Sequence, residues 1–340
     1  MNLDQANGIA DAVLYEGHIL YPYRPSARKN RVRWTFGGVH PRAYSEASGG
    51  VEACRVQAQF PVRGGTDAEY AVRLRFLHLV SRQVLDLEGQ PVESITVDGS
   101  LYQTWEEATE RVVEVRGSLA ELIGPGGREV RVSLPGETGD EPIHAADGVA
   151  MGTLRRTRAS LEAVVTLTAT VPRDGVVVLT AAVANETPMA GAATAAREQA
   201  MRSSLVSTHL VVGVDGAEVV SLTDPPDDLE DLAAACQNIG LWPVLVGEAD
   251  ESDVVLASPI ILEDHPRIAP ESPGSLYDGL EIDEILTLRI LTMTDDEKAE
   301  ARAADDSIRA LLDRTEALTA EDLARMHGTG RALHTGGPHL

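Results

Sequence analysis

Alternation of apolar and polar residues dominates the first two thirds of the chain. In residues 51–60 one face carries Cys54, Val56, Ala58 and Phe60, and after a Gly-Gly turn the alternation resumes over residues 70–80. A period of two on both sides of a glycine turn is typical of an antiparallel hairpin. The sequence therefore predicts a hairpin over residues 51–83.

The strongest strand pattern lies in residues 153–185. Two runs rich in β-branched residues flank the turn Pro172–Gly175, and an Asn-Glu-Thr-Pro sequence follows them. This rhythm of strand, Asp-Gly turn and strand is typical of β-sandwich domains. A further hairpin is predicted over residues 201–222, around Asp215 and Gly216.

The region between these hairpins has a weaker pattern. Short strands are predicted at residues 111–116 and 128–134, on either side of a loop that contains Gly-Pro-Gly-Gly. That loop lacks the Lys-Ser/Thr pair of a phosphate-binding loop. Residues 134–148, rich in Gly, Asp and Pro, predict a long surface loop.

Beyond Asp224 the pattern changes to helices and short buried strands. A helix is predicted at residues 227–237 and another at 280–291, with short apolar strands at 240–247 and 254–262 between them. Thr294 begins a capping box for the next helix, and Thr319 begins a similar motif.

These elements predict an α+β protein. We expect a β-sandwich-like, antiparallel N-terminal region at residues 1–222 and a smaller, mixed, acidic region ending in helices at residues 223–327. Residues 328–340, rich in Gly and His, are expected to form a flexible tail.

Composition narrows the functional classes. The 340 residues are 43 % hydrophobic and carry a formal net charge of −24, so most of the surface should repel a phosphate backbone. Nucleic-acid binding is therefore not expected. No run of about 18 apolar residues predicts a membrane span, and the N-terminus lacks a basic, apolar signal pattern, so a cytoplasmic location is expected. No cofactor is predicted.

The cysteines and most histidines favour structural roles. Cys54 and Cys236 belong to no zinc-type motif and are expected to be free, small apolar residues. His40 and His78 stand alone, so a structural role is favoured over metal binding. For His209, which follows a Ser/Thr-rich run, a strand histidine is favoured over a catalytic one.

Residues 12–36 form a distinctive segment, here called the arm. Aromatic and basic residues are concentrated there in a chain that is otherwise acidic and poor in aromatics, and the candidate partner-binding residues are Tyr15, Tyr21, Tyr23, Arg24, Lys29, Arg33 and Trp34. The favoured interpretation is an arm held against the protein's own acidic C-terminal half. The alternative is a docking element for an acidic partner, because Arg and aromatic residues dominate binding hot spots. Nucleic-acid stacking is the least favoured interpretation.

A second distinctive segment is the Pro-rich stretch at residues 256–291. Asp264, His265, Glu271 and Asp278 are candidates for partner binding, and together with Asp283 they are the loop groups considered for a cation. Carboxylates and a His around Pro turns could also hold a metal ion, for which Asp264, His265 and Glu271 are the candidate ligands. A third reading has these groups bonding within the loop.

Four phrases of the sequence resemble a known family. They are LYEGHILYPYRPSARKNRVRWTFG (14–37), SLVSTHLVVGV (204–214), CQNIGLWPVLVG (236–247) and the stretch SPIILEDHPRIAPESPGSLYDGLEIDEILTLRILTMTDDEK (258–298). Together they resemble uncharacterised actinobacterial proteins encoded beside high-affinity, oxygen-insensitive [NiFe]-hydrogenases. The resemblance implies an accessory or assembly role and assigns no catalytic residue.

The sequence thus supports one main functional hypothesis and two others. The main one is a non-enzymatic accessory protein for assembly or maturation of a [NiFe]-hydrogenase, which binds hydrogenase subunits or maturation factors. The second is a metal-dependent hydrolase or small-molecule enzyme using Asp264, His265, Glu271 and His209. The third is a structural subunit whose two distinctive segments pack on each other. The sequence does not determine the oligomeric state.

Overall fold

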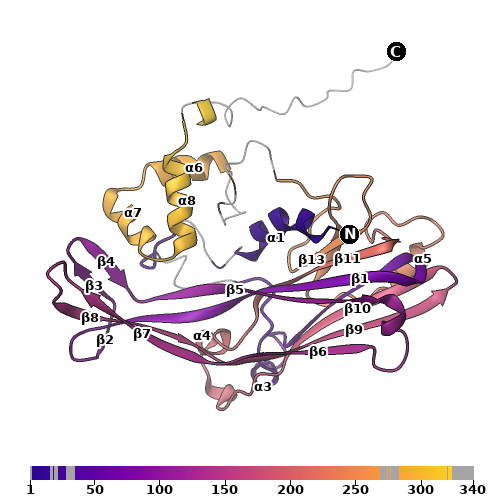
Figure 1. Ribbon diagram of the computed structural model, residues 1–340, viewed down its shortest axis with the longest axis horizontal. Coiled ribbons are helices and arrows are strands. Elements are labelled where there is room, and N and C mark those ends of the chain that lie inside the picture. The colour runs from indigo at the N-terminus through magenta and orange to yellow at the C-terminus, as the bar shows by residue number, and fades with distance from the viewer. Residues whose placement is uncertain are drawn as a thin grey trace.

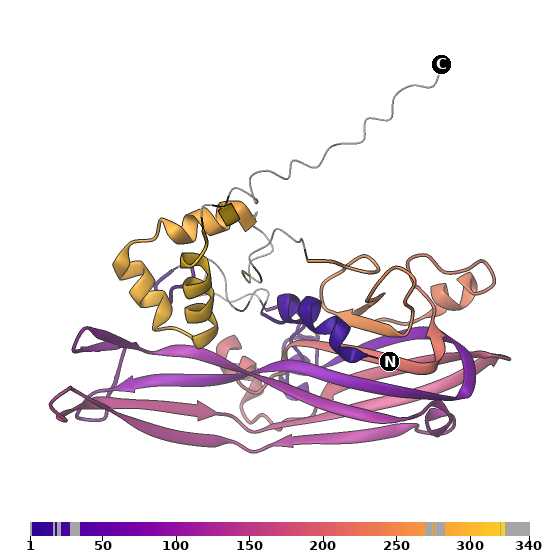
Figure 2. The same ribbon diagram turned by 45° about the horizontal axis from the view of Figure 1, so that its top comes forward.

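The fold is α+β, as the sequence predicts, with antiparallel strands in two facing layers and helices at the C-terminal end (Figure 1). The computed structural model describes residues 2–15, 18, 22–27, 35–268, 274, 276, 283–319 and 321–323. Helices α1 and α6–α8 lie on the same side of the sheet (Figure 2).

One strand, β1 (Arg55–Leu85), connects the two layers. Its first half pairs with β10 (Val176–Asn185), and its second half lies between β5 (Trp105–Ser118) and β11 (Val206–Val219). One layer continues from β10 through β9 (Leu161–Arg173) to β6 (Arg128–Leu134). The other layer continues from β11 through β13 (Val254–Ser258) to β12 (Trp242–Leu245).

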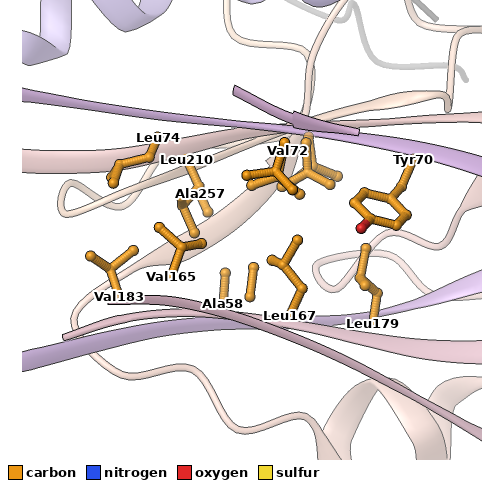
Figure 3. Close-up of a cluster of buried hydrophobic side chains, with 14 of the residues drawn as sticks. Ala58, Tyr70, Val72, Leu74, Val165, Leu167, Leu179, Val183, Leu210 and Ala257 are labelled. Carbon is orange, nitrogen blue, oxygen red and sulfur yellow. The ribbon is translucent and has the colours of Figure 1, made fainter. Parts of the chain in front are cut away.

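The core fills the space between these layers. Because side chains alternate along a strand, every second residue of each layer faces inward, and Figure 3 shows Val72 and Leu210 from one layer opposite Leu167 and Val183 from the other. All four are essentially inaccessible to solvent. Burial of each such aliphatic side chain contributes about 1.5–3 kcal/mol, so this core supplies much of the stability.

Strands β1 and β11 are interrupted by a bulge at the positions where the sequence predicts turns. Between Gly64 and Glu69 of β1, four residues lie opposite the single residue Gly216 of β11, which is a large bulge. Gly64 has φ +152°, and a Cβ there would lie 2.6 Å from the Cβ of Ala217, so only glycine fits this corner. The bulge lets both halves of β1 present apolar residues to the same core.

Of the remaining strands, β2 (Pro91–Val92) and the hairpin of β7 (Glu137–His144) and β8 (Ala150–Arg158) extend the large sheet. Strands β3 (Ser94–Val97) and β4 (Ser100–Gln103) form a separate two-stranded ribbon. Strand β8 pairs with the end of β1. The ribbon packs Ile95, Val97 and Tyr102 against this end of the sheet.

Helices and short 3-10 turns complete the structure. They are η1 (Leu3–Ala6), α1 (Asn7–Leu14), α3 (Arg42–Ala47), η2 (Leu119–Leu122), η3 (Ala192–Thr194), α4 (Arg197–Met201), α5 (Glu230–Ala235), α6 (Asp283–Leu291), α7 (Asp295–Arg302) and α8 (Asp306–Glu316). The predicted capping box is confirmed, since the Thr294 hydroxyl accepts from the Glu297 N–H and the Glu297 carboxylate accepts from the Thr294 N–H.

Several element predictions are confirmed, including the hairpin of β9 and β10, the strand β6 and the helices α5 and α6. Cys54 and Cys236 are free and half-buried. The large sheet continues past residue 222, because β12 and β13 join β11.

Three predictions are wrong. The hairpins over residues 51–83 and 201–222 are instead the continuous strands β1 and β11, because their glycine-containing turns form the two sides of one bulge. The surface loop at residues 134–148 contains the strand β7. That strand is almost wholly exposed and contains Pro142, which an edge strand tolerates, so its composition resembles that of a loop.

Candidate functional site

The arm is anchored to the C-terminal helices by Tyr23. This side chain is fully buried in the apolar cluster between α6, α7 and α8, and its hydroxyl donates a hydrogen bond to the carbonyl of Leu276. The backbone of Tyr23 has φ +57°, a left-handed conformation that bulky residues seldom adopt. The cluster consists of Tyr23, Trp105, Leu276, Leu286, Ile290, Met293, Ala301, Ala304, Ile308, Leu311 and Leu312.

Charged contacts reinforce this anchor. Arg24 lies 3.1 Å from a carboxylate oxygen of Glu297 and 3.9 Å from one of Glu300, and the Ser26 N–H donates to Glu300 at 2.8 Å. The hydrogen bond from the Thr294 backbone and the charge of Arg24 hold the pKa of Glu297 below its ordinary value. This part of the arm is therefore held against the acidic C-terminal half of the protein, which is the interpretation that the sequence favoured.

The arm and the Pro-rich segment meet where Tyr23 bonds to Leu276. Immediately after the arm, Gly37 lies so close to Pro259 that a Cβ on the glycine would be 2.7 Å from the proline ring. Tyr15 is half-buried between two apolar clusters. Tyr21, Lys29, Arg33 and Trp34 lie outside the described residues, as do Glu271 and Asp278.

A groove of about 870 Å³ opens beside the arm. One wall is the outer face of the β3–β4 ribbon, where Thr96 is paired with Leu101 and Ser94 with Gln103. The opposite wall is one face of α7. The full lining is Pro25, Ser26, Pro91, Val92, Glu93, Ser94, Thr96, Gly99, Leu101, Gln103, Thr104, Asp296, Ala299 and Glu300.

The groove combines apolar contacts with negative charge. Glu93, Asp296 and Glu300 line it, and its lining contains no Arg or Lys. Arg24, the basic residue in the described part of the arm, is already paired with Glu297 and Glu300. Prolines and the side chains of Val92 and Leu101 supply the apolar surface. This groove could therefore hold an extended, basic segment of a protein.

Asp264 and His265 have structural partners. One carboxylate oxygen of Asp264 accepts from the hydroxyls of Ser221 and Thr223 at 2.5 and 2.6 Å, and the other accepts from the Leu245 N–H at 2.8 Å. His265 donates its N–H to the Leu245 carbonyl and has φ +53°. Both carboxylate oxygens of Asp264 therefore accept hydrogen bonds from the protein itself, which agrees with the interpretation that these groups bond internally. Within the described part of the chain, no three His, Cys, Asp or Glu residues are grouped as a metal site.

His209 lies under the N-terminal helix and is inaccessible to solvent. Burial lowers the pKa of His209 to about 4, and the charge of Arg75 adds to this effect. Its Nδ1 is 3.1 Å from the carbonyl of Ser207, so Nδ1 carries the proton and the imidazole is neutral at neutral pH. A buried, neutral strand histidine matches the favoured reading of His209.

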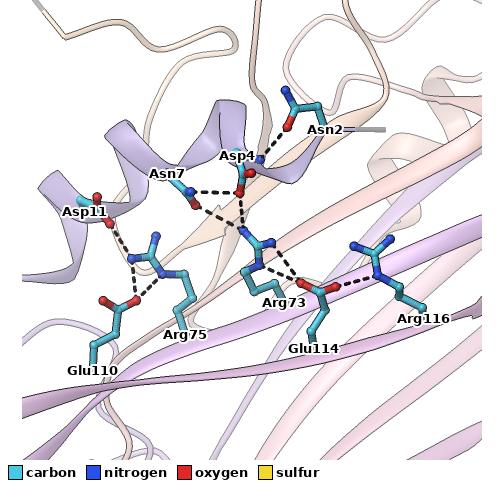
Figure 4. Close-up of polar contacts among 9 residues, drawn as sticks. All are labelled: Asn2, Asp4, Asn7, Asp11, Arg73, Arg75, Glu110, Glu114 and Arg116. Carbon is cyan, nitrogen blue, oxygen red and sulfur yellow. Dashed lines mark hydrogen bonds and ion pairs between the residues drawn. The ribbon is translucent and has the colours of Figure 1, made fainter.

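Arginine side chains of β1 fix helix α1 over the sheet (Figure 4). Arg75 pairs with Asp11 of the helix and Glu110 of β5. Arg73 bridges Asp4 of η1 and Glu114 of β5 in the same way. Paired carboxylates raise the pKa of Arg75 despite its burial. This network explains why the basic residues of β1 alternate with its apolar ones.

The sequence did not indicate a buried chain of polar groups at the opposite side of the sheet. The Ser204 hydroxyl lies 2.9 Å from His40 Nδ1, and His40 Nε2 lies 3.0 Å from Glu52, which also binds Arg197. The order resembles a catalytic triad, but Ser204 is fully buried and also bonds the carbonyl of Ala200. Burial lowers the pKa of His40 although Glu52 opposes it. These hydrogen-bonded side chains connect α3 with α4, which agrees with the structural role expected for His40.

The groove was also missed from the sequence, because the β3–β4 ribbon was not predicted. The signal was present: Asp98 and Gly99, with φ +50° and +81°, form the two-residue turn between short alternating strands.

Comparison with known proteins adds no relative. No protein-family model matches the chain, and a search of curated proteins finds no match. Among the described helices, none has the length and apolar character needed to cross a membrane.

Proposed function

We propose that this chain is a non-enzymatic accessory protein for the assembly or maturation of a [NiFe]-hydrogenase, and that it holds a protein partner in the groove beside the arm. The partner is a hydrogenase subunit or a maturation factor, and the complex forms in the cytoplasm. The partner segment is extended and carries basic side chains.

One observation carries the proposal. Two of the phrases that resemble the hydrogenase-associated family, residues 14–37 and 258–298, meet at the groove and supply Pro25, Ser26 and Asp296 to its lining. Their contact is built from the buried Tyr23 and the ion pairs of Arg24. The most distinctive parts of the sequence therefore converge on one concave surface.

The chemistry of the groove supports a peptide-like occupant. The outer face of the ribbon offers the exposed hydroxyl groups of Ser94 and Thr96, which can bond an extended backbone. The carboxylates of Glu93 and Asp296 are exposed and engage no described cation. They would pair with Lys or Arg of the partner and raise the rate of association.

Affinity capture from the native host tests the proposal. We expect the tagged wild-type chain to recover hydrogenase subunits or maturation factors. The double variant Glu93→Lys, Asp296→Asn should recover about tenfold less, because it reverses one groove charge and removes another. The matched control, Glu129→Lys with Asp295→Asn, makes the same changes of charge on β6 and in the first turn of α7 outside the groove.

The two parts of the proposal fail separately. Capture without any hydrogenase-related protein would refute the assignment of the partner. Equal recovery by the groove variant and its control would refute the groove as the contact. Metal analysis of the same eluate provides a third test, since stoichiometric metal without a protein partner would favour the enzymatic alternative.

A further inference from the structure

Three buried nitrogen atoms without a hydrogen-bond partner lie near one another on the adjoining strands β1, β5 and β8. They are His78 Nδ1, Arg111 Nε and Arg158 Nε. The strand register places His78 of β1 opposite Thr109 of β5, and Phe76 opposite Arg111. Arg158 of β8 donates to the Thr109 hydroxyl at 3.1 Å, and His78 Nε2 lies 3.0 Å from the carbonyl of Ala159. Thr109 is thus the centre of the group.

Unpaired buried nitrogens are costly in a folded protein, so a group of three needs an explanation. Arg111 is the strongest case, because its side chain makes no hydrogen bond or ion pair with the described residues. Burial and then the charge of the nearby Arg158 guanidinium lower the pKa of Arg111, and the charge of Glu137 opposes this shift.

The surrounding carboxylates do not neutralise Arg111. Arg158 also lines a cavity of about 290 Å³, whose acidic residues are Glu137, Asp140 and Glu141. Each of these already has an arginine: Glu137 pairs with Arg158, Asp140 with Arg155, and Glu141 with Arg156. After these pairs are formed, Glu137 is the one carboxylate whose charge acts on both Arg111 and Arg158, so the two arginines keep one positive charge in excess in a protein of net charge −24.

We propose that Arg111, Arg158 and Thr109 form a binding site for a small oxyanion of the phosphate class. A guanidinium binds two oxygens of an oxyanion through Nε–H and one Nη–H, and in both arginines the Nε–H is unused. The Thr109 hydroxyl accepts from Arg158 and keeps its own hydrogen to donate.

His78 favours an anion that carries a proton. Its Nε2 must hold the hydrogen that reaches the Ala159 carbonyl, so in the neutral ring Nδ1 is an acceptor. Hydrogen phosphate and phosphate monoesters offer both acceptor oxygens and, when protonated, an O–H donor. Sulfate offers acceptors only. The site is therefore expected to prefer phosphate over sulfate.

Calorimetric titration with inorganic phosphate, glycerol 3-phosphate and sulfate tests the proposal. We expect saturable binding of phosphate to the wild-type chain and at least about tenfold weaker binding to Arg111→Gln, because charge-assisted hydrogen bonds are lost. Arg42→Gln is the matched control, since it removes one exposed arginine charge from α3 and should bind as the wild type does. Circular dichroism confirms that each variant is folded.

Each outcome decides a question. Glycerol 3-phosphate binding as tightly as phosphate would identify phosphorylated small molecules as the source of the anion, and much weaker binding would identify free phosphate. Equal binding to the Arg111 and Arg42 variants, or no saturable binding of phosphate at all, would overturn the proposal and leave Arg111 as a solvated surface arginine.

Discussion

The sandwich and the helical end of this protein are stabilised in different ways. The sandwich core is a large, continuous set of aliphatic side chains that alternate along strands, and β1 contributes to both of its layers. The helical end has a small core in which one aromatic residue from the arm, Tyr23, is surrounded by three short helices. Its contacts with the strands are the apolar side chain of Trp105 from β5 and a few polar bonds, as where Arg82 donates to the Ala303 carbonyl and Gln103 to the Glu300 carbonyl.

The two regions therefore differ in how specific their residues must be. Alternating strands require only apolar residues at every second position, so many sequences could form the sandwich. The helical end requires particular residues, because Tyr23 needs its pocket and Arg24 needs Glu297 and Glu300. The distinctive phrases of the chain are found where the structure is most specific, and the groove lies there.

The largest expected effect comes from truncating the sandwich core. Leu210→Ala should lower the free energy of unfolding by about 3–5 kcal/mol, because it leaves a cavity between the layers. Urea denaturation followed by circular dichroism measures this loss. The matched variant Leu312→Ala, in the helical core, should instead reduce hydrogen-exchange protection in α6–α8 and leave the sandwich protected. If both variants reduced protection everywhere, the two regions would form one cooperative unit.

Acid should weaken the sandwich through His209. The pKa of this histidine is about 4 in the folded protein and near 6.5 when unfolded, so its contribution is complete above pH 6.5 and is lost as the pH falls towards 4. Between pH 7 and pH 5 the loss should be about 2 kcal/mol. His209→Gln should reduce this pH dependence, measured as the urea midpoint at both pH values. His144→Gln, which changes an exposed histidine, should retain it.

The smallest effect is expected at the capping box of the helical end. Thr294→Ala removes the hydroxyl that accepts from the Glu297 N–H and should cost about 1 kcal/mol of local stability. Hydrogen exchange at the first amides of α7 measures this change. Thr292→Ala serves as a control, since Thr292 lies outside the helix. Equal exchange in both variants would show that packing, and not the cap, holds this end of α7.

The sequence predicted which segments form helices, strands and turns better than it predicted which strands pair with one another. The Asp174–Gly175 turn and the Thr294 cap were identified because their contacts are local. Gly64–Gly65 and Asp215–Gly216 have equally good turn chemistry, but they face each other across a bulge. A local pattern cannot distinguish a hairpin from a bulge whose other side lies about 150 residues away in the chain.

The candidate site shows the same limit. Composition identified the arm and the Pro-rich segment, and the bond from Tyr23 to Leu276 brings them together. The orphan nitrogens of Arg111 and Arg158 could not be foreseen, because burial and pairing depend on strands β1, β5 and β8 at once.

The long strand β1 also has a consequence for biosynthesis. Its partners β10 and β11 are translated well over a hundred residues after it, which at cellular rates of elongation takes on the order of ten seconds. During that interval its first half has no antiparallel neighbour, and an unpaired apolar strand edge is prone to aggregation. The nascent chain should therefore depend on chaperone protection until residue 219 has left the ribosome.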